Sequence, residues 1–432
     1  MKQTTIDIVM NPVTFDNTKL SIVKKNGLIR SAIFDSNGKM CCFSPLSSNK
    51  DETLFFEKNH LRRSVILEEY VEGTMINLFY NNDHWEIATK QAIGGNNKFF
   101  ISTTNKPQSF KEMFLECCKS CDLNIEDLDK SLIYSFVMQH VNNRIINPVS
   151  ENKLYIIHIY QVPESCYPNK VNIVYPLYRS DKNRGCLQEY FGKSQVSDPA
   201  IYDYDSYNNR DSIIDHFASP KTPYDTMGIN LFDSNTGNRM KFRNPNYEEL
   251  KKLRGNQAKM EYHYLTLRKY NKVYEFLDFF PEYTEEFNMY EAKVQNFMYE
   301  FYNNYNSCYL KHENPLKMYP REFRKHMYNI HSDYLETHIH TKFERIVAYV
   351  NELPEAVLLS SINYHLRNQN SQNNSESNSI GEYEEHDTLV EEGEIHHEHH
   401  KKKHHGGVKH GRGKHSRIHH LHNTEVNAQC NE

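Results

Sequence analysis

Residues 67–93 read LEEYVEGTMINLFYNNDHWEIATKQAI, and this stretch carries the clearest local pattern in the chain. Apolar residues predict one strand over Met75–Tyr80 and a second over Trp85–Thr89. The intervening residues Asn81, Asn82 and Asp83 are turn formers. The stretch therefore predicts an antiparallel hairpin at the centre of a mixed domain.

The same pattern of short alternating apolar segments, broken by turn residues, runs from Gly27 to about Asn244. It predicts further strands over Ser131–His140, Leu154–Val162 and Gly228–Phe232. A helix is expected from about Ser109 to Cys121, because apolar residues recur there at spacings of three and four: Phe110, Phe114, Leu115 and Cys118.

The nine cysteines form no even framework and follow no secretory leader, so reduced thiols are expected. Cys118 and Cys121 have the spacing of a zinc knuckle, but the body of the chain has no second knuckle. We therefore interpret Cys117, Cys118 and Cys121 as helix residues near a core.

After Pro245 the apolar period becomes helical and stays so until roughly Arg367. One apolar stripe contains Phe287, Tyr290, Val294, Phe297, Phe301 and Tyr305, and another contains Ile339, Phe343, Ile346, Val347 and Val350. The sequence thus predicts an α+β fold with three parts: a mixed domain with antiparallel sheets over 1–244, an all-α domain over 245–367, and a tail over 368–432. The tail has too few apolar side chains to offset the entropy of ordering, so it should be disordered by itself.

Five segments occur in the order found in the phage-type RNA ligase 1-like family of covalent nucleotidyltransferases. Tyr70-Val71-Glu72-Gly73-Thr74 occupies the slot of that family's Lys-x-Asp-Gly-Ser motif. The other segments resemble its Arg-Gly-Ile-x-Phe strand, its Phe-Glu-Phe-Val-x-Pro-x-Asn-Arg-Ile-Val segment, its Glu-Gly-x-Val strand and its Val-Lys-Ile-Lys strand; here they read RSAIF (30–34), FVMQHVNNRII (136–146), MGIN (227–230) and MKFR (240–243). The resemblance implies an RNA ligase-like, ATP-grasp-type nucleotidyltransferase domain that would use ATP and magnesium.

Three departures from the family pattern imply that the adenylation chemistry is lost. Tyr70 replaces the lysine nucleophile, and a phenol with a reference pKa of about 10 is a poor nucleophile at neutral pH. Val137 and Met227 stand where the family has carboxylates that position a metal or the nucleotide sugar. Gln139 or Glu72 could supply an oxygen, but neither replaces the lost charge.

The chain keeps cationic residues where the resembling family has them, and the resemblance therefore implies a residual basic cleft. Arg30, Lys90, Lys241 and Arg243 would point from strands toward RNA or nucleotide phosphates. Two alternatives stay open: an active ATP-dependent RNA ligase that uses Lys90 as a relocated nucleophile, and a structural or scaffold protein that reuses only the fold.

A second group of cations and rings lies at the start of the helical region, and this mixture is typical either of RNA contact or of a solvated amphipathic helix. It contains Lys251, Lys252, Arg254, Lys259, Arg268 and Lys269 with Tyr262, Tyr264 and Tyr270.

The formal net charge of −5 argues against a uniformly basic nucleic-acid coat, so any RNA site must be local. No segment reaches the roughly 18 uninterrupted apolar residues that cross a bilayer, so we expect no membrane partner and a cytoplasmic location. Heavy use of Lys, Asn, Tyr and Ile indicates an A/T-rich genome, such as that of a large DNA virus. In the tail, His396, His397, His399 and His400 could chelate a transition metal weakly.

Overall fold

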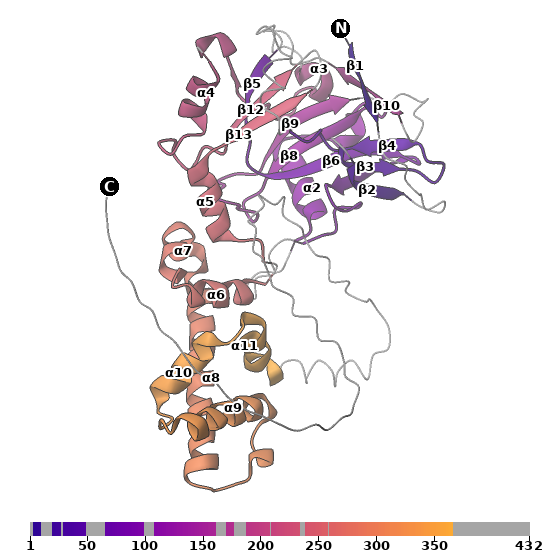
Figure 1. Cartoon of the computed structure of the whole chain (residues 1–432). Coiled ribbons are helices and arrows are strands. Elements are labelled where there is room, and N and C mark those ends of the chain that lie inside the picture. Colours follow the sequence, from indigo (N-terminus) through magenta and orange to yellow (C-terminus); the bar gives the residue numbers. More distant parts are fainter. Residues whose placement is uncertain are drawn as a thin grey trace, which may run out of the picture. The chain divides into compact units, whose positions relative to one another are not determined.

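The computed structural model describes residues 3–9, 20–26, 29–48, 65–98, 108–160, 170–176, 187–207, 209–233, 238–257 and 259–365 (Figure 1). The predicted disordered tail, with His396, His397, His399 and His400, lies outside these residues. Met1–Ser379 form one compact unit. The division of this unit into domains over 1–244 and 245–367 stays a prediction.

The first sheet confirms the hairpin and the strands predicted around it. It contains β6 (Thr74–Asn81), β7 (His84–Thr89), β8 (Ile133–Gln139) and β9 (Lys153–Tyr160), in the antiparallel order β7-β6-β8-β9. The turn residues Asn82 and Asp83 have φ angles of 47° and 62°. Positive φ at both central positions is typical of a type I′ turn, whose twist matches that of the paired strands.

Helix α2 (Phe110–Ser120) covers one face of this sheet, together with α3 (Leu187–Phe191). Ser109 and Glu112 form a capping box at its N-terminus. Cys117 and Cys118 of α2 and Cys121 at its C-cap are buried in the core beneath, as expected from the sequence. The prediction for Leu115 was wrong, because its side chain is 41% exposed and Met113 takes its place in the core.

The second sheet contains the last strands of the mixed region. Its order is β11 (Ile201–Tyr202), β5 (Val65–Glu69), β12 (Gly228–Asp233) and β13 (Arg239–Arg243), and neighbours are antiparallel. Helix α4 (Arg210–Phe217) covers its apolar face with Ile213 and Phe217. The smaller sheets are β2 (Ser21–Asn26), β3 (Ile29–Phe34) and β4 (Met40–Phe43), and the pair β1 (Gln3–Val9) and β10 (Lys170–Pro176).

The other faces of the two larger sheets meet, and they are more polar. The rings of His158 on β9 and Phe232 on β12 lie 5.7 Å apart. Because side chains alternate along a strand, the residues between the apolar ones point to this side. On β5 and β12 these are Glu68 and Asn230, which are 1% and 6% exposed. The sheets therefore enclose buried polar groups whose positions the strand register determines.

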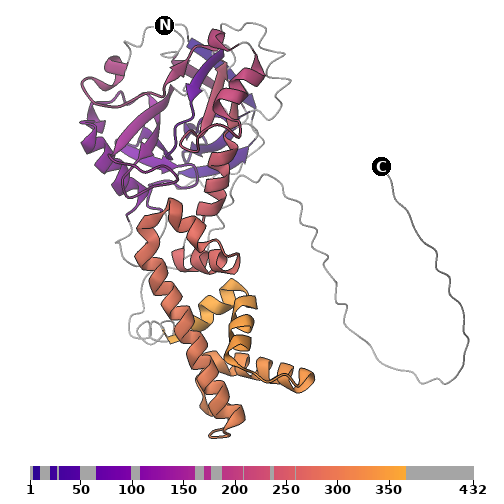
Figure 2. The same ribbon diagram turned by 90° about the vertical axis from the view of Figure 1, so that its left-hand side faces the viewer.

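The helical region contains α5 (Pro245–Arg254), α6 (Met260–Lys269), α7 (Val273–Phe279), α8 (Thr284–Tyr305), α9 (Arg321–Thr337), α10 (Phe343–Glu352) and α11 (Glu355–Ile362). Helices α6, α9, α10 and α11 contact α8, the long helix in Figure 2. All six residues of the predicted α8 stripe are buried, which confirms it. The prediction for Ile339 was wrong, because it precedes α10 and is 58% exposed. None of the helices in the described ranges is long and apolar enough to cross a membrane.

Two glycines allow close backbone approaches, Gly73 against β8 of the first sheet and Gly228 within the second sheet. A Cβ on Gly73, whose φ is +150°, would lie 2.5 Å from the Met138 carbonyl oxygen. A Cβ on Gly228, whose φ is +129°, would lie 2.1 Å from the Phe242 carbonyl oxygen. Neither position can accept a side chain without movement of the backbone.

We expect Gly73→Ala and Gly228→Ala each to lower the free energy of unfolding by more than about 2 kcal/mol, because each adds both a clash and an unfavourable φ. Urea denaturation measures this change. Gly192→Ala is the matched control, since Gly192 also has positive φ (+58°) but has no atom within 4 Å of the added Cβ. It should cost only about 1 kcal/mol, and equal losses in all three variants would contradict the packing argument.

Candidate functional site

Tyr70 follows β5 directly and meets Lys241 of β13 across the intervening strand β12. Lys241 Nζ donates a hydrogen bond to Tyr70 Oη at 3.0 Å and lies 4.9 Å from the centre of the ring. The register pairs Glu69 with Ile229, so Tyr70 falls beside Gly228. Lys241 pairs with Asn230 of β12, so its side chain reaches Tyr70 diagonally across that strand.

Cationic side chains surround Tyr70. Burial raises the pKa of Tyr70 above its ordinary value of 10.0, and the charges of Arg243, Arg30 and Arg239 act in the opposite direction. The phenol therefore stays protonated at neutral pH. The structure thus places Arg30, Arg239 and Arg243 near the phenol that Lys241 contacts, and a phosphate site there stays a prediction. We call these residues and Tyr70 the Tyr70 cluster.

Carboxylates balance part of this charge. Arg243 Nη1 lies 3.2 Å from Oε1 of Glu248, which is in the first turn of α5. Arg239 Nη2 lies 3.7 Å from Oε1 of the buried Glu68. Sequence reasoning missed Arg239, although it lies two residues before Lys241 and so shares its side of the strand.

Lys90 belongs to the other large sheet, unlike Lys241. It follows β7 in a turn in which the Thr89 amide donates to the Ala92 carbonyl oxygen at 2.8 Å. Its side chain is partly buried.

Glu72 also lies in the predicted slot, but its carboxylate is used within the fold. Oε1 accepts hydrogen bonds from the backbone amides of Ile146 (3.0 Å) and Asn147 (3.1 Å), and Oε2 accepts one from Asn147 Nδ2 (3.2 Å). Burial raises the pKa of Glu72, and the amide of Ile146 acts in the opposite direction. The Gln139 side chain donates to the Glu72 carbonyl oxygen at 2.8 Å. Both side chains that could have replaced the missing carboxylates are therefore engaged.

The residues present do not fit a catalytic magnesium ion. Val137 packs with Val71 and Ile157 in a small apolar cluster, and Met227 packs against the helical core. Both positions hold apolar packing side chains, so neither supplies the oxygen ligand that magnesium requires. Within the described part of the chain, no group of three or more His, Cys, Asp or Glu side chains could hold a metal ion.

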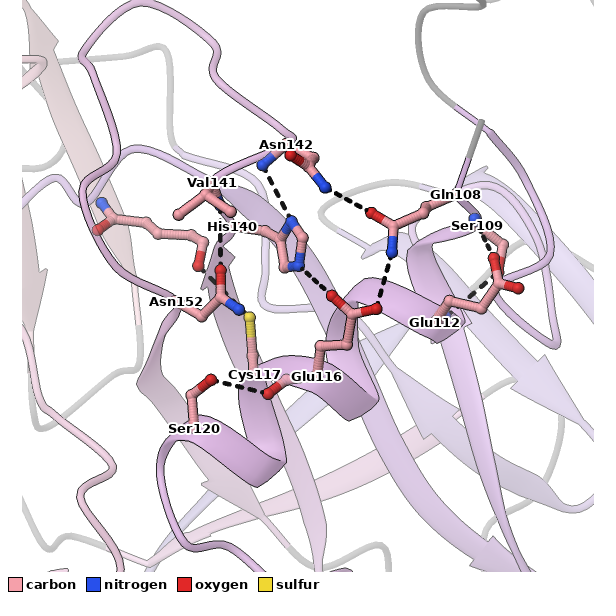
Figure 3. Close-up of polar contacts among 11 residues, drawn as sticks. Gln108, Ser109, Glu112, Glu116, Cys117, Ser120, His140, Val141, Asn142 and Asn152 are labelled. Atoms are coloured by element: carbon pink, nitrogen blue, oxygen red, sulfur yellow. Dashed lines mark hydrogen bonds and ion pairs between the residues drawn. The ribbon is translucent and has the colours of Figure 1, made fainter. Parts of the chain in front are cut away.

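The segment after β8 is fixed at both ends. Figure 3 shows buried His140, whose Nε2 lies 2.8 Å from Glu116 of α2 while its Nδ1 accepts from the Asn142 amide at 3.1 Å. Farther along, Arg144 makes two hydrogen bonds to Glu282, at 2.9 and 2.8 Å, and a third to the Phe279 carbonyl oxygen at 2.8 Å. This segment thus joins α2 to the helical region.

Part of the second predicted group of cations and rings is structural, while Lys252, Lys259 and Tyr270 are exposed. Tyr264 is 2% exposed and Arg254 is 3% exposed, so neither is available to RNA. Arg254 Nη2 donates instead to Tyr283 Oη at 2.9 Å. Tyr270, 65% exposed, remains the accessible ring of the predicted set.

Comparisons with known proteins assign no family. No protein-family model matches the chain, and no curated protein matches it. Among solved structures it is similar to a provisionally assigned ATP-dependent DNA ligase from Aquifex aeolicus, with 14% sequence identity, 77% of this chain and 83% of that chain covered, and a TM-score of 0.29. A likeness at that TM-score is too weak to support an argument about fold or activity.

We expect Glu72→Gln to lower the free energy of unfolding by about 1–3 kcal/mol, because it puts an amide donor where the carboxylate now meets only donors. Urea denaturation measures the loss. Glu126→Gln is the control, since Glu126 is exposed and its side chain should contribute less than about 0.5 kcal/mol. An unchanged stability of Glu72→Gln would show that this carboxylate does not hold the Ile146–Asn147 segment.

Proposed function

We propose that the Tyr70 cluster binds phosphate groups of RNA or of a nucleotide without forming a covalent intermediate, in a catalytically degenerate, RNA ligase-like nucleotidyltransferase domain. The observation that carries the proposal is the contact between Lys241 and Tyr70, with Arg30, Arg239 and Arg243 around the same phenol. Guanidinium and ammonium groups bind phosphate through charge-assisted hydrogen bonds, which need no nucleophile.

The loss of catalysis rests on the chemistry at Tyr70. A nucleotidyl intermediate of the ligase type needs a deprotonated amine that attacks the α-phosphorus. Here a protonated phenol with a raised pKa takes that place. The positions expected to hold carboxylates carry Val137 and Met227. Binding is therefore the part of the ligase-like chemistry that these residues still support.

The two alternatives predict different outcomes. An active ligase that uses Lys90 requires this lysine to reach the α-phosphate from the sheet opposite Lys241, and it should yield a covalent lysyl-nucleotide. A scaffold protein should bind neither RNA nor nucleotide at the Tyr70 cluster.

We expect the double variant Lys241→Ala/Arg243→Ala to bind RNA more weakly. The slope of the logarithm of the binding constant against the logarithm of the salt concentration should fall in magnitude by about 1.4, because each lost single-strand phosphate contact removes roughly 0.7. Filter binding with a labelled oligonucleotide at several salt concentrations measures both changes. Lys119→Ala/Lys193→Ala is the matched control, because both lysines are exposed and lie outside both predicted groups of RNA-contacting cations.

Incubation with α-labelled ATP and magnesium should leave no covalent label on the wild-type protein. A phosphoramidate adduct mapped to Lys90 would establish the ligase alternative. Equal binding by the wild-type protein and the cluster variant would contradict the proposed site and favour the scaffold.

A further inference from the structure

The connection between α8 and α9 forms a built turn, which we call the α8–α9 tip (residues 306–320). It contains the π-helix η6 (Asn306–Leu310) and the 3₁₀ helix η7 (Leu316–Met318). Ser307 fixes it, because its Oγ donates to Glu313 Oε2 at 2.5 Å and lies 2.7 Å from Tyr319 Oη. Figures 1 and 2 both show this connection projecting past the ends of α8 and α9.

The tip presents aliphatic side chains to solvent. Leu310 is 58% exposed and Met318 is 67% exposed, whereas the neighbouring Tyr319 is 7% exposed. Leu310 is the last residue of η6, and Met318 is the last residue of η7. Ser307 lies in η6 and bonds to Tyr319, the residue after Met318, so it fixes the backbone near both side chains. A single exposed apolar side chain is common on a protein surface, so the cations near these two residues decide which partner fits.

Three exposed cationic side chains lie near Met318 in the sequence. Lys317 lies between Leu316 and Met318, and Arg321 and Lys325 lie one turn apart on the exposed face of α9. Within the described ranges, none of these three cations forms a hydrogen bond or an ion pair. The charge of Lys311 is partly balanced by Glu313, because its Nζ lies 3.7 Å from Glu313 Oε1.

We propose that the α8–α9 tip docks on an anionic lipid surface, with Leu310 and Met318 inserted among the acyl chains and Lys317, Arg321 and Lys325 at the headgroups. Apolar insertion combined with cation–headgroup attraction is the usual basis of peripheral membrane binding. The contact is peripheral and needs no membrane-spanning helix. It rests on the tip alone and is independent of the Tyr70 cluster.

Two other partners fit the tip less well. A single-stranded nucleic acid would be expected to meet planar rings that stack on bases, but the exposed large apolar side chains of the tip are Leu310 and Met318. A second copy of this chain would bring the same cations together and would be repelled.

The test is flotation of the full-length protein with vesicles at about 150 mM salt, comparing pure phosphatidylcholine with mixtures containing phosphatidylserine. The wild-type protein should float only with the anionic vesicles. We expect Leu310→Ser/Met318→Ser and Lys317→Gln/Arg321→Gln each to weaken binding about tenfold or more. Thermal unfolding of each variant verifies that the fold is retained.

Lys252→Gln/Lys259→Gln is the control and should float like the wild-type protein. The tip variants keep the other basic residues of the chain. A loss of binding in the tip variants but not in this control would therefore be due to the tip. Flotation that is absent in the wild-type protein, or unchanged in both tip variants, would overturn the proposal. Loss of RNA binding in Lys317→Gln/Arg321→Gln without any flotation of the wild-type protein would identify the tip as a nucleic-acid surface instead.

Discussion

The buried carboxylate of Glu72 is the interaction on which the arrangement around the Tyr70 cluster depends most. Burial of a carboxylate is costly unless donors satisfy it, and here the backbone amides of Ile146 and Asn147 do so. These bonds fix the segment that contains Arg144. Arg144 in turn binds Glu282 of the helical region. One carboxylate therefore links the residues after β5, the segment after β8 and, through Arg144, the part of the helical region between α7 and α8.

The same constraint shapes the backbone between Tyr70 and β6. Gly73 follows Glu72 at a positive φ that no bulkier residue fits, so the backbone at the slot is determined by packing. Tyr70 keeps a polar group where the resemblance places an amine, and Lys241 donates to it. Under the proposed function, this contact keeps the cations around a phenol, which is a poor nucleophile at neutral pH.

Local patterns in the sequence predicted most of the elements. The β6–β7 hairpin follows from alternation and turn chemistry, and α8 follows from its apolar stripe, because both signals depend on neighbouring residues. Leu115 and Ile339 were misplaced, since an apolar residue on a short helix or beside it can face solvent when no partner element covers it. The internal use of Glu72 was also out of reach, because its partners Ile146 and Asn147 lie far away in the sequence and donate through their backbone.

Chemical footprinting of lysines tests the central claim most directly. Amine acylation of the full-length protein, followed by mass spectrometry, reports the reactivity of each lysine with and without a single-stranded oligonucleotide or ATP. The account predicts that the reactivity of Lys241 falls when ligand is present, while that of the exposed Lys119 on α2 does not change. Unchanged reactivity of Lys241, under conditions in which ligand binding is demonstrated independently, would contradict a phosphate site at Tyr70.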